Sequence, residues 1–127
     1  MIFIDTSVWI EYFKAKESPV QRVLHELLDQ DQVALPSLVW LEILSGARKS
    51  EMAKLKRVLS ALPRFYPDEA TWKKVEEWIE VGLNNGQRFG VADLLIAAIA
   101  TEHKAKLWTL DSDFKRMAKL GFLELQP

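Results

Sequence analysis

The sequence predicts an α/β fold in which a mainly parallel sheet is covered by helices on both faces. Short apolar runs rich in Ile, Val, Leu and Phe alternate along the chain with longer segments of helical periodicity. The short runs are apolar throughout, which is typical of strands that are buried on both sides. The length of 127 residues, 49% of them hydrophobic, suits one domain that spans residues 1–127.

The first half of the chain begins with an apolar strand and continues through alternating helix and strand signals. Ser18, Pro19 and Gln21 form a helix start, because Ser is a favoured N-cap and Pro fits the first helical position. Pro36 stops the second apolar run. The predicted elements are a strand at 2–4, a helix at 6–14, a helix from 18, a strand at 33–35 and a helix from 37 to about 47.

The second half of the chain continues this alternation. Ser50 and Asp68 are predicted helix N-caps, and Gly86 and Gly121 are predicted helix ends. The long helix that starts at Asp68 is expected to bury a face that holds Trp72, Val75, Ile79, Gly82 and Leu83. The predicted elements are a helix from 50, a strand at 64–66, helices at 68–86 and 91–104, a strand at 107–110, a helix at 114–120 and a last strand at 123–125.

The composition excludes several classes of protein. The net charge is −1, from 17 Lys and Arg against 18 Asp and Glu, so a dominant polycationic surface for nucleic acid is not expected. The absence of Cys excludes disulfides, a thiol nucleophile and Cys-bound zinc. No apolar run approaches the ~20 residues of a membrane helix and the N-terminus lacks a signal-peptide pattern, so we expect a cytoplasmic protein without membrane association.

Four carboxylates stand out because apolar sequence surrounds or precedes them. Asp5 and Asp111 each follow a predicted strand, whereas Glu42 and Asp93 lie within apolar helical segments. Each has a structural alternative: Asp5, Asp93 or Asp111 as a helix cap, and Glu42 as an exposed helix residue. Asp113 is a further candidate, because only one of Asp111, Ser112 and Asp113 is needed to cap the helix that follows.

Jointly, these side chains predict a metal site. The carboxyl ends of parallel neighbouring strands meet at one edge of a sheet, where ligands bind in open α/β folds. Carboxylates that converge there repel one another, so the pKa of at least one should rise unless a cation relieves the repulsion. A set of oxygen ligands without Cys or His favours Mg²⁺ or Mn²⁺ over zinc.

The same four stretches carry a resemblance to a known family. Residues 4–10 (IDTSVWI), 42–46 (EILSG), 92–98 (ADLLIAA) and 109–114 (TLDSDF) occur in the order and spacing of the PIN-domain endoribonucleases of the VapC type. The chain resembles these toxins of type II toxin–antitoxin pairs over nearly its whole length. The resemblance implies a PIN-like α/β/α sandwich and a Mg²⁺- or Mn²⁺-dependent site that hydrolyses RNA phosphodiesters, leaving 5′-phosphate and 3′-hydroxyl ends.

The resemblance also implies roles for single residues and partners. Asp5, Glu42, Asp93 and Asp111 match the family's acidic positions, with Thr6 or Ser7 in support through hydrogen bonds and Asp113 as a further ligand through a water. A VapB-like cognate antitoxin and a homodimer are the partners that it implies.

Other residues and other functions stay open at this stage. Arg88 precedes the Asp93 segment, where it is either a contact for an RNA phosphate or a solvated charge. His25 and His103 are predicted surface residues, which argues against RNA cleavage by a metal-free His pair. A Mg²⁺-binding receiver-like domain fits the length but would need paired acids after the first strand, where Thr6 and Ser7 stand. A non-catalytic acidic module that binds a basic partner is the remaining alternative.

Overall fold

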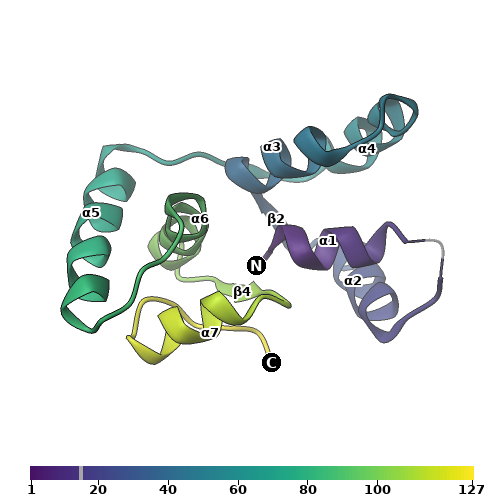
Figure 1. Ribbon diagram of the computed structural model, residues 1–127. Helices are drawn as coiled ribbons and strands as arrows, with labels where there is room; N and C mark the ends of the chain where they lie inside the picture. The colour runs from purple at the N-terminus through teal and green to yellow at the C-terminus, as the bar shows by residue number, and fades with distance from the viewer. Residues whose placement is uncertain (15) are drawn as a thin grey trace.

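The fold is described by a computed structural model that covers residues 1–14 and 16–127 (Figure 1). The elements in chain order are β1 (Ile2–Ile4), α1 (Thr6–Tyr12), α2 (Pro19–Asp29), β2 (Val33–Pro36), α3 (Ser37–Gly46), a 3₁₀ turn η1 (Lys49–Glu51), α4 (Met52–Leu59), β3 (Arg64–Phe65), α5 (Glu69–Asn84), α6 (Val91–Glu102), β4 (Lys106–Trp108) and α7 (Ser112–Lys119).

The four strands form one parallel sheet in the order β3-β2-β1-β4, within the described residues. The chain leaves β1 toward β2 and β3 on one side and returns to place β4 on the other, so the order reverses between β1 and β4. A right-handed crossover places its helix on one face of the sheet when the next strand is added on one side, and on the other face when it is added on the opposite side. Accordingly, α1 and α2 lie on one side of the strands and α5 and α6 on the other (Figure 1). The predicted α/β/α arrangement with a parallel sheet is therefore confirmed.

The core forms where the strands meet α6. Phe3, Ile4, Leu35 and Leu107 are fully buried, as expected of strands that are covered on both faces. Every residue from Leu94 to Ala100 is buried as well, so α6 runs through the interior of the protein. Since α6 carries Asp93 in its first turn, the burial of this helix determines where that carboxylate lies.

Several predicted boundaries differ from the structure. The strand predicted at 107–110 is β4 at Lys106–Trp108, and the helix predicted at 6–14 ends at Tyr12. The strand predicted at 123–125 is a single bridge between Leu125 and Leu107. Ser50 is not a helix cap, because it lies inside η1, where the Arg48 amide donates to the Glu51 carboxylate, and α4 starts only at Met52.

The buried face of α5 also differs from the prediction. Trp72, Ile79 and Leu83 are exposed, with Trp72 52% accessible, whereas Thr71, Val75 and Gly82 face the core. Thr71 tolerates burial because its hydroxyl and amide both bond to Asp68, and these hydrogen bonds hold the pKa of Asp68 below its usual value. The apolar residues of α5 therefore occupy two faces, of which this chain buries one.

No helix among the described residues has both the length and the apolar character that crossing a bilayer requires. His25 and His103 are both exposed, as predicted.

Candidate functional site

Asp5 lies where the strand order reverses, at the carboxyl end of β1. The Asp5 amide donates to the Trp108 carbonyl of β4 at 2.9 Å, so the chain ends of the two strands stay adjacent. The side chain is only 5% exposed, and its Oδ2 accepts hydrogen bonds from the Ser7 hydroxyl at 2.7 Å and the Thr109 hydroxyl at 2.9 Å. Asp5 is also the N-cap of α1, so its structural and site positions coincide.

Asp111 is held on the β4 side of the same edge. It is the N-cap of α7, and its Oδ1 accepts the Asp113 amide at 2.9 Å. The Asp111 amide in turn donates to the Thr109 hydroxyl at 3.0 Å. Thr109 therefore connects two acidic residues: it donates to Asp5 and accepts from the backbone of Asp111.

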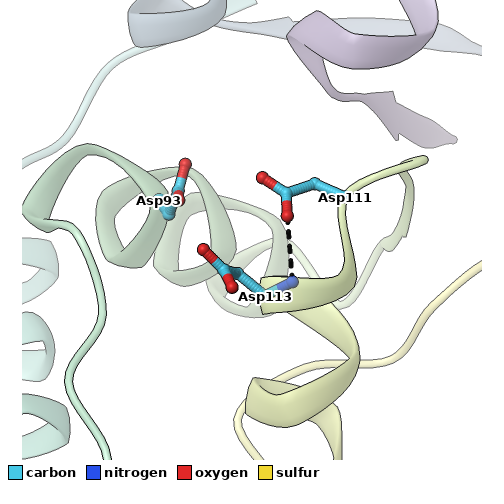
Figure 2. A group of neighbouring side chains, drawn as sticks. All are labelled: Asp93, Asp111 and Asp113. Atoms are coloured by element: carbon cyan, nitrogen blue, oxygen red, sulfur yellow. Dashed lines mark hydrogen bonds between the residues drawn. The ribbon is translucent and has the colours of Figure 1, made fainter.

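Asp93 completes a group of three carboxylates, named here the aspartate cluster (Asp93, Asp111 and Asp113). One oxygen of each lies within 4.8 Å of the others, and the three side chains turn toward a common space (Figure 2). Asp93 sits in the first turn of α6, whose N-cap is Gly90, so Asp93 is not the helix cap. The start of α6 and the start of α7 thus present their acidic side chains to each other.

The pKa of Asp93 is raised by its burial and by the negative charges around the aspartate cluster. Burial, followed by the negative charges of Asp5, Asp111, Glu42 and Asp113, raises the pKa of Asp93 to about 6. The predicted rise in a carboxyl pKa is therefore found at Asp93. The carboxylates are close enough to repel one another, and the space between them favours a proton or a cation.

Glu42 reaches the site from α3. Its side chain is exposed, and its Oε1 accepts a hydrogen bond of 2.7 Å from the Thr6 hydroxyl of α1. Its effect on the pKa of Asp93 places it in the same electrostatic environment. The structure thus brings Asp93, Asp111 and Asp113 within ligand distance of one another. Asp5 and Glu42, which were also predicted as metal ligands, lie outside that group but close enough to raise the pKa of Asp93, and they are bonded to Ser7 and Thr6.

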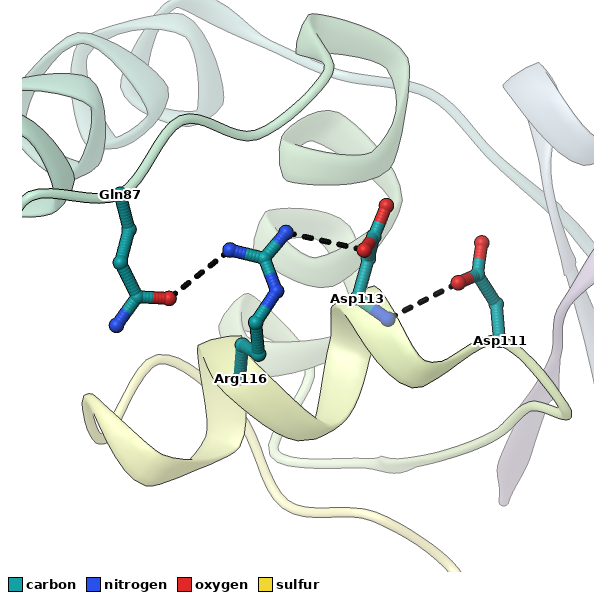
Figure 3. Close-up of polar contacts among 4 residues, drawn as sticks. All are labelled: Gln87, Asp111, Asp113 and Arg116. Atoms are coloured by element: carbon teal, nitrogen blue, oxygen red, sulfur yellow. Dashed lines mark hydrogen bonds and ion pairs between the residues drawn. The ribbon is translucent and has the colours of Figure 1, made fainter.

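The basic side chain that meets the cluster is Arg116, which the sequence did not single out. Its Nη2 donates to Asp113 Oδ1 at 3.0 Å and its Nη1 donates to Gln87 Oε1 at 3.0 Å (Figure 3). Arg88 is exposed, and among the described residues no hydrogen bond or ion pair joins it to an acidic side chain. The helical spacing of Asp113 and Arg116, three residues apart, is a signal that was available in the sequence.

Thr109 is the other residue that sequence analysis missed. Ile4 pairs with Trp108 in the parallel register, so the next residues, Asp5 and Thr109, lie opposite each other beyond the strand ends. Finding this pair from sequence requires knowing that β1 and β4 are neighbours.

The donor set of the aspartate cluster fits a hard divalent cation. All its ligand atoms are carboxylate oxygens, and several such oxygens at close range match the preference of Mg²⁺ and Mn²⁺. Asp93 makes no hydrogen bond among the residues that the structure describes, so its charge is free to bind a cation.

Comparison with known proteins agrees with this fold. The PIN domain model matches residues 2–120. VapC ribonuclease Mb1587 of Mycobacterium bovis and ribonuclease VapC11 of Mycobacterium tuberculosis are each 32% identical over 98% of this chain and 96% of their own length. Among solved structures, VapBC2 from Rickettsia felis bound to a promoter DNA fragment superposes with a TM-score of 0.80 and 26% identity, covering 99% of this chain and 98% of the other.

The parallel sheet, the acidic edge and the family match define the class as PIN-domain proteins. Within that class, the chain belongs to the VapC ribonuclease family, as its sequence resemblance implies.

Proposed function

We propose that this protein is a divalent-metal-dependent endoribonuclease and the toxin of a type II toxin–antitoxin pair. The observation that carries the proposal is the aspartate cluster at the edge where the strand order reverses, with the pKa of Asp93 raised to about 6. A phosphodiester is anionic and would be repelled by these side chains alone. The cluster therefore suits a nuclease only if a cation binds to it.

Asp93, Asp111 and Asp113 would hold Mg²⁺ or Mn²⁺, and Asp5 and Glu42 would complete the acidic environment. When bound, the ion supplies positive charge that offsets the carboxylates and the phosphodiester and acidifies the attacking water. Ser7 and Thr109 orient Asp5, and Thr6 orients Glu42, through hydrogen bonds to their carboxylate oxygens. The α7 cap orients Asp111. These bonds fix the acidic side chains before substrate arrives.

RNA is the substrate that the relatives support, since the curated relatives are named ribonucleases. An antitoxin is the partner that the VapBC2 structure supports, and a basic side chain from it would be attracted to the acidic edge. The exposed apolar residues Trp72, Ile79 and Leu83 on α5 are consistent with a homodimer. With an RNA substrate, the proposed site of action is the cytoplasm, and Arg88 remains a proposed phosphate contact.

Metal removal tests the proposal directly. Purified protein should cleave RNA with Mn²⁺ or Mg²⁺, lose cleavage in EDTA and regain it when the ion is added back. Sequencing of the RNA ends after expression should find 5′-phosphate ends in cells with the wild type that are absent with Asp93→Asn. Cleavage that persists in EDTA with the same ends would exclude the metal-dependent mechanism.

A non-catalytic acidic binding module is the second candidate, because the same unrelieved charge would attract a basic partner. Such a module would bind its partner and leave RNA intact in every metal condition. The receiver-like alternative loses support, because after β1 Asp5 is followed by Thr6 and Ser7, whose hydroxyls support Glu42 and Asp5.

A further inference from the structure

Arg116 contacts three different groups beside the aspartate cluster. One guanidinium nitrogen donates to Asp113 and another to Gln87 (Figure 3). The guanidinium carbon also lies 4.6 Å from the centre of the Phe89 ring. Asp113 belongs to α7, whereas Gln87 and Phe89 belong to the loop that leads into α6. Arg116 therefore bridges the two elements that carry Asp113 and Asp93.

The loop side of this bridge is itself held in place. The Gln87 amide donates to the Gly82 carbonyl of α5 at 2.8 Å, and Phe89 packs edge-to-face on Phe122 with ring centres 6.1 Å apart. A Cβ at Gly82 would lie 3.1 Å from the Gln87 carbonyl oxygen, a tight contact that Gly avoids where the loop approaches α5. The loop is thus a fixed anchor for the guanidinium.

At the other end of the bridge, Asp113 uses only one of its two carboxylate oxygens to bind Arg116. Arg116 binds Oδ1 of Asp113, while Oδ2 makes no hydrogen bond among the described residues. An exposed Arg–Asp pair alone contributes little, because a mobile side chain is costly to order. Here the guanidinium is already ordered by Gln87 and by the Phe89 ring, so it can order the Asp113 carboxylate in turn.

We infer that Arg116 is a positioning residue, which ties Asp113 to the loop at Gln87 and so fixes that carboxylate opposite Asp93 for cation binding. The inference rests on the proposed metal-dependent function. Arg116 acts through Asp113 and reaches neither the cation nor the RNA in this role. Partners of metal-binding side chains typically contribute about 10–100-fold to metal affinity.

A role of Arg116 through its charge alone and a role in positioning Asp113 predict opposite changes in Mn²⁺ affinity when Arg116 is replaced. If Arg116 only added positive charge, Arg116→Met would tighten Mn²⁺ binding, because a competing cation is removed. If Arg116 positions Asp113, the same variant weakens Mn²⁺ binding by about tenfold. Gln87→Met removes the anchor while leaving every charge of the site in place. It should weaken binding by about threefold, less than the loss of Arg116 itself, because the bond from Arg116 to Asp113 remains.

The experiment is a calorimetric titration of the full chain with Mn²⁺ at pH 7.5, after circular dichroism has verified the fold of each variant. Lys115→Met is the matched control, because it removes one positive charge from an exposed neighbour on α7, and we expect affinity close to that of the wild type. Gln87→Glu keeps an acceptor for Arg116 and should retain wild-type affinity or bind more tightly. At saturating Mn²⁺, RNA cleavage by Arg116→Met and Gln87→Met should return toward the wild-type rate.

Tighter Mn²⁺ binding by Arg116→Met, or unchanged binding by Gln87→Met, overturns the positioning role while the wild-type titration and its metal-dependent cleavage leave the proposed function standing. If Arg116→Met does not fold, Gln87→Met and Gln87→Glu decide the question. A wild type that does not bind Mn²⁺ at all refutes the proposed function, and the positioning role is refuted with it.

Discussion

Asp5 and Asp93 lie at the same acidic edge but meet it in different ways. Asp5 is 5% exposed and receives hydrogen bonds from Ser7 and Thr109, so its negative charge is stabilised within the protein. Asp93 receives none among the described residues and faces four other carboxylates, and burial together with their charge raises its pKa to about 6. Of two carboxylates at one edge of the sheet, Asp5 is thus stabilised by hydrogen bonds within the protein and Asp93 is not.

This difference between Asp5 and Asp93 distinguishes a carboxylate that stabilises the fold from one that is expected to serve the cation site. The Thr109 bond to Asp5 also joins the end of β1 to the chain after β4, so removing this side chain should damage the fold. The charge of Asp93 opposes folding when no cation is bound, so removing that charge should not damage the fold. A residue that is unfavourable for the free protein and surrounded by oxygen ligands is the stronger indication of a cation site.

The largest effect is expected from Asp93→Asn. Loss of this charge should lower RNA cleavage by at least about 100-fold, since even partners of ligand residues contribute about 10–100-fold. The melting temperature without metal should stay the same or increase, because one repelling charge is gone. Initial rates with Mn²⁺ and melts in EDTA measure the two effects, with exposed Asp29→Asn on α2 as the control. A large drop in melting temperature would mean that Asp93 has a structural role instead.

A matched pair of truncations compares the two residues directly. Asp5→Ala should destabilise the free protein by about 2 kcal/mol, because a helix cap is lost and the two hydroxyls lose their acceptor. Asp93→Ala removes the same atoms without breaking such bonds, so its unfolding free energy in EDTA should be close to that of the wild type. Urea denaturation measures both variants. Equal destabilisation by the two would remove the distinction between them.

The helices and strands could be predicted from the sequence more readily than which of them lie next to one another. Alternating apolar runs and helical periods predicted the strands and the parallel sheet, because buried strands and helix caps leave local signals. The termini of β4 and of the last bridge were misjudged, because apolar residues such as Leu110 continue past the strand into the exposed turn. The buried face of α5 was wrong for a related reason: a Thr that bonds to Asp68 is buried in place of Trp72.

The acidic residues could be found because a charge inside an apolar helix is conspicuous, as at Asp93. Whether they come together depends on the strand order, which no local pattern encodes, so their proximity followed only from the expected topology. Thr109 could not be assigned, because a Thr just before a helix is common. Arg116 was overlooked although its spacing from Asp113 suits an ion pair on one helix face, because that spacing alone does not reveal a role at the site. Their roles depend on partners that lie far away in sequence, 104 residues in the case of Thr109 and Asp5 and 29 in the case of Arg116 and Gln87.

The raised pKa of Asp93 predicts how the stability of the metal-free protein changes with pH. Its pKa rises from 3.8 in the unfolded chain to about 6 in the folded one, so the folded protein binds the proton more tightly. The stability that Asp93 contributes is therefore present below pH 3.8 and is lost as pH rises through about 6. Solvent screening of this half-buried group reduces the effect to about 1 kcal/mol, or about 4 °C.

The measurement is the difference in melting temperature between Asp93→Asn and the wild type in EDTA, because shared titrations cancel in the difference. It should be small at about pH 3.5, an acidity at which Asp93 is protonated in both the folded and the unfolded chain, and reach its full value by about pH 7.5. Mn²⁺ should stabilise the wild type more than the variant and reverse the sign of the difference. A difference that does not vary with pH would contradict the raised pKa.

The smallest effect is expected from Thr109→Val, which tests whether the support of Asp5 extends to the cation. The change removes one donor to Asp5 and one acceptor for the Asp111 amide while keeping the shape of the side chain. Thr101→Val is the control, because it also removes one hydroxyl hydrogen bond, to the Phe122 carbonyl, away from the acidic edge. Each variant should lose about 0.5–1.5 kcal/mol of stability. Only Thr109→Val should weaken Mn²⁺ binding, by about threefold rather than tenfold, because Ser7 still donates to the same oxygen. Equal Mn²⁺ affinity in the two variants would mean that Thr109 supports the fold alone.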